Sequence, residues 1–183
     1  MKQIVVCLAN GFEEVEAVTA IDVLRRAKLD VVVAGVGTLQ PRGSRGLNVV
    51  TDMSIENVAP RDVWAVILPG GMPGASNLAA SPEVESLCRF VVKSQGYLGA
   101  ICAAPAVVLE KFALLQGRQF TCYPGFESHC QDGKYIGGSV VEDGHLITGE
   151  GPGAAMEFAL KLVNVLAGDS RFFEVRKGLF PCE

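Results

Sequence analysis

Four runs of mostly apolar residues set the pattern of the first hundred positions. They cover residues 3–9, 29–36, 63–68 and 97–101, and the first three are followed at once by Asn, Gly or Pro. Nearly continuous apolar runs, without polar alternation, are typical of strands that are covered on both faces, as in a parallel sheet. The sequence therefore predicts a mostly parallel sheet.

Segments with helical periodicity separate these runs. Over residues 13–28, apolar side chains recur on one face, with acidic residues near the start and basic residues near the end. This charge order complements the dipole of a helix. Residues 81–94 repeat the apolar pattern, with Pro82 well placed for a first helical turn. Helical spacing returns over residues 106–115 and in a last long helix that extends to Leu166.

A short hairpin is predicted in the last third of the chain. Residues 139–142 and 145–148 flank Asp143-Gly144, a strong hairpin turn signal, so part of the sheet is expected to be antiparallel. The alternation of strands and helices predicts a doubly wound, flavodoxin-like α/β fold, in which helices sandwich a mostly parallel sheet. We expect one domain over residues 1–183, because no linker-like segment or internal repeat divides the chain.

Composition narrows the classes of partner. The 183 residues are 49% hydrophobic, enough to bury a full core, and carry a net charge of −4 with a pI near 5.3. No cluster of Lys and Arg suggests a nucleic-acid surface, so no nucleic-acid partner is expected. The longest apolar runs are too short to span a membrane, and no convincing secretory signal is present. We therefore expect no membrane association and a cytoplasmic location.

The six cysteines are expected to be free thiols, because several lie inside apolar runs of a chain that is large for a disulfide scaffold. No CxxC pair occurs and only two histidines are present, so no metal site is expected, even at the nearest cluster, Cys122, His129 and Cys130. The glycine-rich segment 149–153 matches no phosphate-binding fingerprint, and we interpret it as a structural loop. No cofactor is expected.

A cysteine lies where a predicted strand meets a predicted helix, in the segment 99–105, GAICAAP. Small residues two positions before and after it, Ala100 and Ala104, meet the steric requirement of a nucleophile elbow at Cys102. Such a turn holds the sulfur at a helix amino terminus, where the thiolate is favoured. A buried structural cysteine explains the same pattern, and the residues alone leave both interpretations open.

Several other residues are candidates for supporting chemistry at Cys102. Gly70 and Gly71 follow a buried strand, and their amides, with that of Ala103, suit an oxyanion hole, although paired glycines more often form an ordinary turn. Glu16 becomes a candidate general acid and base if it points inward beneath the Cys102 loop. Arg45 fits either a surface charge or an anion clamp, and the surface interpretation is favoured.

These motifs, taken together, resemble the ThiJ/PfpI superfamily, in the branch of the human parkinsonism-associated protein deglycase and bacterial ThiJ-like proteins. The resemblance covers essentially the whole chain. It is carried, in the family's order, by residues 11–16 (GFEEVE), 44–46 (SRG), 68–71 (LPGG), 100–105 (AICAAP) and 151–153 (GPG).

The resemblance implies a role for each candidate residue. Cys102 is the reactive cysteine, Glu16 is a protonated acid hydrogen-bonded to its sulfur, and the amides of Gly71 and Ala103 face the substrate oxygen. The remaining residues of the implied substrate site are Gly70, Arg45, Tyr123 and Pro152. The family also implies a homodimer that forms through the first helix and neighbouring loops.

The implied function is that of a cofactor-independent glyoxalase or deglycase, acting on methylglyoxal-type dicarbonyls or their early adducts. The alternative is a redox-sensing or chaperone-like stress protein that operates through oxidation of Cys102. Protease activity is disfavoured because Ala103 stands where the protease-like branch has a histidine. A role in thiamine biosynthesis is disfavoured because no nucleotide or thiazole signature is present. Tyr123 stands where the animal branch has a pocket histidine, which leaves substrate preference open.

Overall fold

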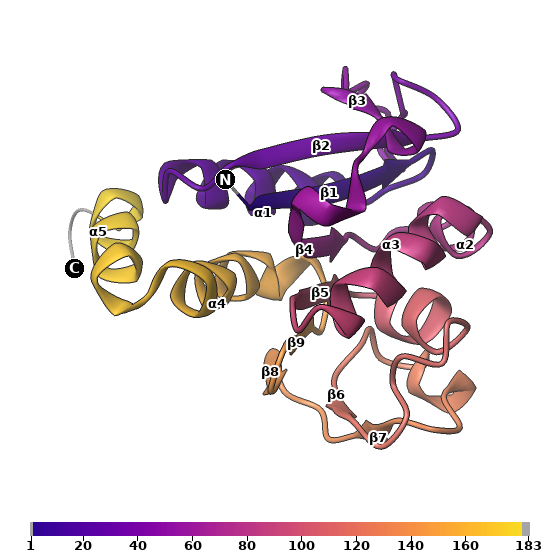
Figure 1. The fold of residues 1–183 in the computed structure, drawn as a ribbon. Helices are drawn as coiled ribbons and strands as arrows, with labels where there is room; N and C mark the ends of the chain where they lie inside the picture. The colour runs from indigo at the N-terminus through magenta and orange to yellow at the C-terminus, as the bar shows by residue number, and fades with distance from the viewer. Residues whose placement is uncertain (1, 181–183) are drawn as a thin grey trace.

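A seven-stranded sheet forms the centre of the protein, in a computed structural model that describes residues 2–180 (Figure 1). The strand order is β3-β2-β1-β4-β5-β9-β8, and only the pairing of β8 with β9 is antiparallel. A separate two-stranded sheet joins β6 and β7. The strands are β1 Gln3–Ala9, β2 Val31–Val36, β3 Met53–Ser54, β4 Val63–Leu68, β5 Tyr97–Ile101, β6 Gln119–Phe120, β7 Lys134–Tyr135, β8 Val140–Asp143 and β9 Leu146–Gly149.

Helices cover both faces of the sheet. On one face α1 packs against α4, which also contacts β5 and β9, while α3 contacts β4 and β5 and α2 contacts β1 on the other. The α-helices are α1 Glu14–Arg26, α2 Gly74–Ala79, α3 Pro82–Lys93, α4 Ala155–Ala167 and α5 Asp169–Leu179. Shorter helical turns are η1 Ile55–Asn57, η2 Pro60–Asp62, η3 Pro105–Leu109, η4 Glu127–His129 and η5 Pro152–Ala154.

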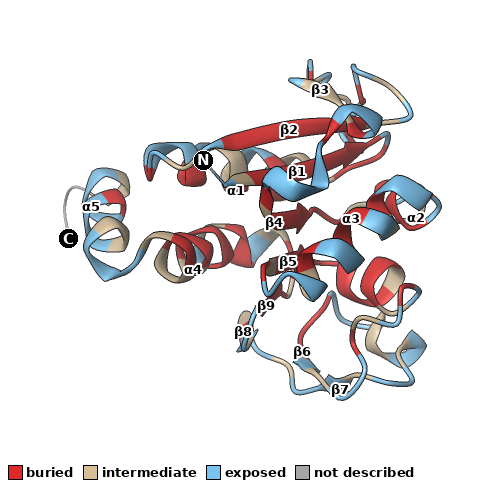
Figure 2. Ribbon diagram, in the orientation of Figure 1, coloured by how far each residue is buried: buried red, intermediate tan, exposed pale blue. Residues whose placement is uncertain are grey.

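The predicted fold class is confirmed, and the central strands show why continuous apolar runs predict it. Six of the seven residues of β1 and five of the six residues of β4 are buried, because helices lie over both faces of these strands. Figure 2 shows buried residues along β1, β2, β4 and β5, and mostly exposed or half-buried residues on α5 at the far end of α4.

Three details differ from the sequence prediction. The hairpin register pairs Asp143 with Leu146, so the turn residues are Gly144 and His145, one position later than predicted. The helix after Cys102 contains a π-helical segment, because the amide of Glu110 bonds to the carbonyl of Pro105 five residues earlier. The sequence analysis also missed short or weakly amphipathic elements, namely α2, α5, β3, β6 and β7.

Helix α4 is held on the sheet by a large side chain that packs over two glycines. Phe158 is fully buried, and a Cβ atom added at Gly99 or at Gly149 would lie 3.2 Å from its ring. The missing side chains on β5 and β9 therefore leave the space that the ring fills, directly behind the strand ends that carry Cys102.

Replacing this ring should cost much of the stability of the fold. We expect Phe158→Ala to lower the free energy of unfolding by about 3–5 kcal/mol, since it leaves a cavity between α4 and the sheet. Phe173→Ala is the matched control, because Phe173 is 63% exposed on α5, and its effect should stay within about 0.5 kcal/mol. Urea unfolding measures both values, and equal effects would contradict the packing described here.

Candidate active site

The backbone at Cys102 has the conformation of a nucleophile elbow. Cys102 follows β5 directly and has a φ of +64°, which is unusual for a residue other than glycine. Its amide donates to the carbonyl of Gly149 (2.9 Å), and its carbonyl accepts from the amide of Tyr123 (2.9 Å). The helix begins at once, with the amide of Val107 bonded to the carbonyl of Ala103. These bonds fix the strained turn from both sides.

Glu16 lies beneath this turn, although it is a charged residue type on a surface helix. Its side chain projects inward from the first turns of α1, and the residue is only 1% exposed. The amide of Gly70 donates to its Oε2 atom (2.7 Å), and the carboxyl also interacts with the thiol of Cys102. The Oε1 atom is buried and meets no donor with good hydrogen-bond geometry among residues 2–180.

Gly70 is a glycine because the two reactive side chains occupy the space where its side chain would stand. An added Cβ atom would lie 2.6 Å from Cβ of Cys102 and 2.9 Å from Oε2 of Glu16. Gly71 has a φ of +83°, and its own Cβ would collide with the backbone at Glu13. The paired glycines are therefore more than a turn: they let the end of β4 approach both side chains.

Burial and neighbouring charge oppose ionisation in the pair of Glu16 and Cys102. Burial raises the pKa of Glu16 to about 7, against the hydrogen bonds from Gly70 and Cys102, which lower it. Burial and the charge of an ionised Glu16 raise the pKa of the Cys102 thiol to about 12, while the amides of Gly71 and Ala103 lower it. The elbow by itself therefore does not make the thiol acidic, contrary to expectation. Ionisation of the sulfur requires that Glu16 hold the proton.

Tyr123 and Pro152 line a cavity of about 600 Å³. The ring of Tyr123, which is 46% exposed, packs over Gly151, where an added Cβ would lie 3.1 Å from the ring. Because the amide of the same tyrosine bonds to Cys102, the cavity wall is tied to the elbow. The structure thus brings these two predicted site residues together in one cavity wall.

Arg45 is placed differently from the other candidates. It is exposed, and the contact that fixes its position is made by its backbone amide, which donates to Oε1 of Glu14 (2.6 Å). Ser44 reinforces this link by donating to Glu13 or Glu14. The loop therefore rests against the start of α1, and no contact within residues 2–180 directs the Arg45 guanidinium toward Cys102.

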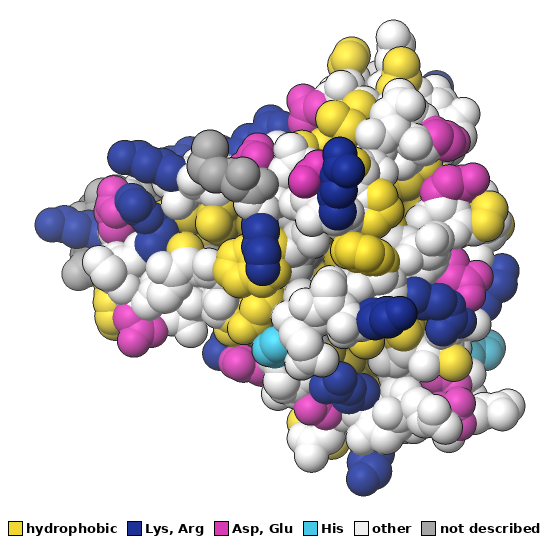
Figure 3. All heavy atoms as spheres, in the orientation of Figure 1, with side chains coloured by type: hydrophobic (Ala, Val, Ile, Leu, Met, Phe, Trp, Pro, Cys, Tyr) yellow, Lys and Arg dark blue, Asp and Glu magenta, His cyan; other side chains and the backbone are white. Residues whose placement is uncertain are grey.

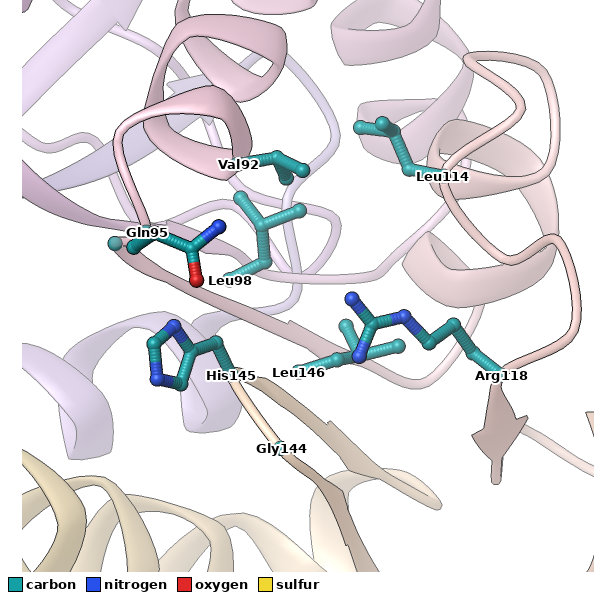
Figure 4. A pocket seen from close by; sticks show the side chains of 9 residues that line it. Val92, Gln95, Leu98, Leu114, Arg118, Gly144, His145 and Leu146 are labelled. Carbon is teal, nitrogen blue, oxygen red and sulfur yellow. The ribbon is translucent and has the colours of Figure 1, made fainter.

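A second cavity, of about 250 Å³, lies at the amino ends of β5 and β9 (Figure 4). Leu98 and Leu146, near the beginnings of β5 and β9, form part of it, with the side chains of Gln95, Arg118 and His145 nearby. Cys102 follows the other end of β5, so this cavity is separate from the reactive thiol. Ligands of doubly wound folds bind at the carboxyl ends of the strands, which favours the cavity at Tyr123.

Sequence analysis missed Glu150 and Ser139, which also line the cavity at Tyr123. Glu150 belongs to the segment that was interpreted as a structural loop, and nothing in its local pattern indicates a site. Only the tertiary fold places this loop against Tyr123. No group of three or more His, Cys, Asp or Glu side chains within residues 2–180 is arranged to hold a metal ion.

Comparison with known proteins identifies close relatives. The Drosophila melanogaster protein dj-1beta is 41% identical over 181 residues, covering 97% of this chain and 96% of its own. The glutathione-independent glyoxalase DJR-1.2 of Caenorhabditis elegans is 37% identical over 169 residues, covering 91% of this chain and 89% of its own. Two DJ-1 homologues of Arabidopsis thaliana match 96% of this chain, but the chain spans only 40% and 45% of their lengths.

Solved structures agree with the sequence relatives. The crystal structure of Drosophila DJ-1beta superposes with a TM-score of 0.93, covering 97% of each chain. The structure of oxidised Toxoplasma gondii DJ-1 gives a TM-score of 0.94 at 37% identity, covering 98% of each chain. The DJ-1/PfpI family matches residues 2–165, which include the elbow, Glu16 and the cavity wall at Tyr123, and the chain belongs to that family.

Proposed function

We propose that this protein is a cysteine-dependent, cofactor-independent glyoxalase or deglycase, acting on methylglyoxal-type dicarbonyls or their early adducts. The observation that carries the proposal is the buried contact of the Glu16 carboxyl with the Cys102 thiol, both of which lie against Gly70. A nucleophile beside a proton carrier is what addition to an aldehyde and the following proton shift both require. The glyoxalase name of the C. elegans relative supports the same reaction class.

The first chemical step forms a carbon–sulfur bond. Sγ of Cys102 attacks the aldehyde carbon, and the thiol proton passes to the Glu16 carboxylate. The amides of Gly71 and Ala103, which already point at the sulfur, donate to the aldehyde oxygen as negative charge develops on it. Protonation of that oxygen completes a hemithioacetal. With a pKa near 7, Glu16 is suited to accept and return protons at neutral pH.

The second step moves hydrogen within the bound substrate. Glu16 carries a proton from the former aldehyde carbon to the neighbouring ketone carbon, which converts the hemithioacetal into the thioester of a 2-hydroxy acid. Water then hydrolyses the thioester, releasing the hydroxy acid and the thiol. One carbon is oxidised and its neighbour is reduced, so the isomerisation needs no external oxidant or reductant. Only the hydrolysis of the thioester consumes water.

A redox-sensing or chaperone-like role in oxidative stress remains the alternative. The solved structure of an oxidised relative, Toxoplasma gondii DJ-1, favours it by analogy. In this chain Cys102 is 8% exposed as a residue, and its sulfur lies beside two amides that would also stabilise a sulfinate. Turnover distinguishes the roles, because an enzyme converts many substrate molecules per chain, whereas a sensor reacts once.

We also propose a homodimer in the cytoplasm. Val15 and Val18 are 51% and 44% exposed on the same face of α1, and Val50 is 77% exposed, which supports contact with a second copy.

The five described cysteines are free, as suits a reducing compartment. Basic and acidic side chains are interspersed on the face shown in Figure 3. No helix within residues 2–180 has the length and apolarity to cross a bilayer.

Removal of the sulfur tests the proposed function directly. Purified wild-type protein should convert many equivalents of methylglyoxal to lactate in a steady-state assay, and Cys102→Ala should abolish this turnover. Cys7→Ala is the control for loss of a thiol, because Cys7 is buried in β1 and has no place in the mechanism. If the folded wild-type protein consumes only one equivalent of methylglyoxal per chain, the proposal that it is an enzyme is refuted.

Glu16→Gln separates proton transfer from hydrogen bonding. Glutamine keeps a donor but cannot carry a proton, so turnover should fall by about two orders of magnitude while peroxide still oxidises Cys102. Glu13→Gln removes a charge one turn away and should retain most activity. Near-normal turnover in folded Glu16→Gln would eliminate the proton-carrier role and favour the sensor.

Burial of Glu16 also makes stability depend on pH. Its pKa rises from 4.5 in the unfolded chain to about 7 in the folded protein, so folding favours the protonated carboxyl. The contribution of Glu16 to the free energy of unfolding is fully present below pH 4.5. It is lost as pH rises through 7, and the loss amounts to about 3 kcal/mol. We expect urea unfolding to show this decline for wild type relative to Glu16→Gln. A constant difference from pH 4.5 to 8 would contradict it.

Sedimentation tests the homodimer. At micromolar concentration the wild type should sediment as a dimer, and Val15→Asp/Val18→Asp should be a folded monomer, since two charges would enter the proposed interface. Arg25 and Arg26 of α1 pair within the chain with Asp52 and Asp22. A monomeric wild type would rule out the dimer.

A further inference from the structure

The cavity at Tyr123 and Pro152 is lined by one charged residue. Its lining is otherwise formed by the ring of Tyr123, a serine, two prolines and small residues, and it contains no Lys, Arg or His. Glu150 is the charged residue. The full lining is Tyr123, Pro124, Ser139, Glu150, Gly151, Pro152, Gly153 and Ala154.

Glu150 is held by its backbone, while its carboxylate is left for other contacts. The amide of Glu150 donates to the carbonyl of Ser139 (2.9 Å), and the residue is half-buried at the end of β9. Its carboxylate makes no hydrogen bond or ion pair with another group of residues 2–180. A carboxylate on a cavity wall without a cation is poised to meet a ligand that supplies one.

A second carboxylate adds to the negative potential at this rim. Glu127 accepts a hydrogen bond from the amide of Gly125, two residues beyond Tyr123. Slight desolvation and then the charges of Glu127, Cys122 and Glu150 raise the pKa of the Tyr135 phenol, so the potentials of the two glutamates overlap. An anionic substrate entering from this side would approach negative charge with no basic side chain in the lining to offset it.

Two segments of the cavity wall are bonded to the backbone of the reactive cysteine or adjoin a residue that is. The ring of Tyr123 lies in the wall with Gly151, and its amide bonds to the carbonyl of Cys102. Glu150 directly follows Gly149, whose carbonyl accepts from the amide of Cys102. Tyr123 and the residue before Glu150 are thus both bonded to the backbone of Cys102, which makes Glu150 the nearest charged residue of this cavity wall along the chain from the elbow.

We infer that Glu150 is a specificity-determining residue that makes the site prefer dicarbonyls with a cationic remainder over dicarbonyls with an anionic remainder. This inference rests on the proposed function. Coulomb attraction between two unit charges at a partly solvated site changes affinity by several-fold to about tenfold. Because the carboxylate is partly solvated, the preference should weaken as ionic strength rises.

Aryl glyoxals with the same reactive group and different remote charge test the inference. We expect kcat/KM of the wild type to fall in the order para-trimethylammonium, para-methyl and para-carboxylate phenylglyoxal, with a cation-to-anion ratio of about tenfold or more. Glu150→Gln should bring this ratio close to one, and Glu150→Lys should invert it. Glu157→Gln is the matched control, since it removes an exposed charge from α4 outside this cavity. It should keep the wild-type ratio.

Alkylation of Cys102 gives a second readout that needs no turnover. Iodoacetamide and iodoacetate differ in charge, and mass spectrometry of the peptide that contains Cys102 gives the rate constant for each. The amide-to-acid rate ratio should be several-fold larger in the wild type than in Glu150→Gln. Equal ratios in the two proteins would overturn the role of Glu150, even if methylglyoxal is turned over. A shifted alkylation ratio without turnover of methylglyoxal would contradict the proposed function while supporting the charge selectivity.

Discussion

The short contact between the Gly70 amide and the Glu16 carboxyl is the constraint on which the site depends. It holds a carboxyl group in the interior, where burial raises its pKa to about 7, and leaves its second oxygen without a well-placed donor. The contact is possible only because residue 70 has no side chain, since Cβ of Cys102 and the Glu16 carboxyl fill that space. The reactive pair and the glycine are therefore one packing unit.

The fold supplies this unit from three separate segments. Parallel strands β4 and β5 end side by side, which brings Gly70 next to Cys102. Helix α1 begins at the same end of the sheet, and its Glu16 side chain points inward. On the far side of the elbow, Gly149 and Tyr123 bond to the backbone of Cys102. Behind the strands, Phe158 of α4 fills the space over two glycines. The reactive geometry thus depends on core packing as much as on local turn conformation.

Much of this arrangement follows from the sequence, because apolar runs and helical spacing report burial directly. The elbow was predictable, since Ala100 and Ala104 leave room for a sharp turn. The sequence did not decide whether Glu16 points inward, because three acidic residues lie at the start of α1 and their positions on the helix do not show which one is buried. The elbow alone predicted a favoured thiolate, whereas burial and then the charge of Glu16 raise the pKa of the thiol, and both come from tertiary packing of distant segments. Nothing in the local sequence around Glu150 indicates that it lines a cavity.

The central claim is that Glu16 acts as the proton reservoir for Cys102 near neutral pH. Carbon-13 NMR of protein labelled at the glutamate carboxyl carbon, with the Glu16 signal assigned by its absence in Glu16→Gln, measures this protonation directly. The account predicts a titration midpoint near pH 7 for Glu16, as its burial requires. A midpoint near 4.5, the ordinary value for a solvated glutamate, would contradict it, because the carboxylate would then be too weak a base to hold the proton of the thiol near neutral pH.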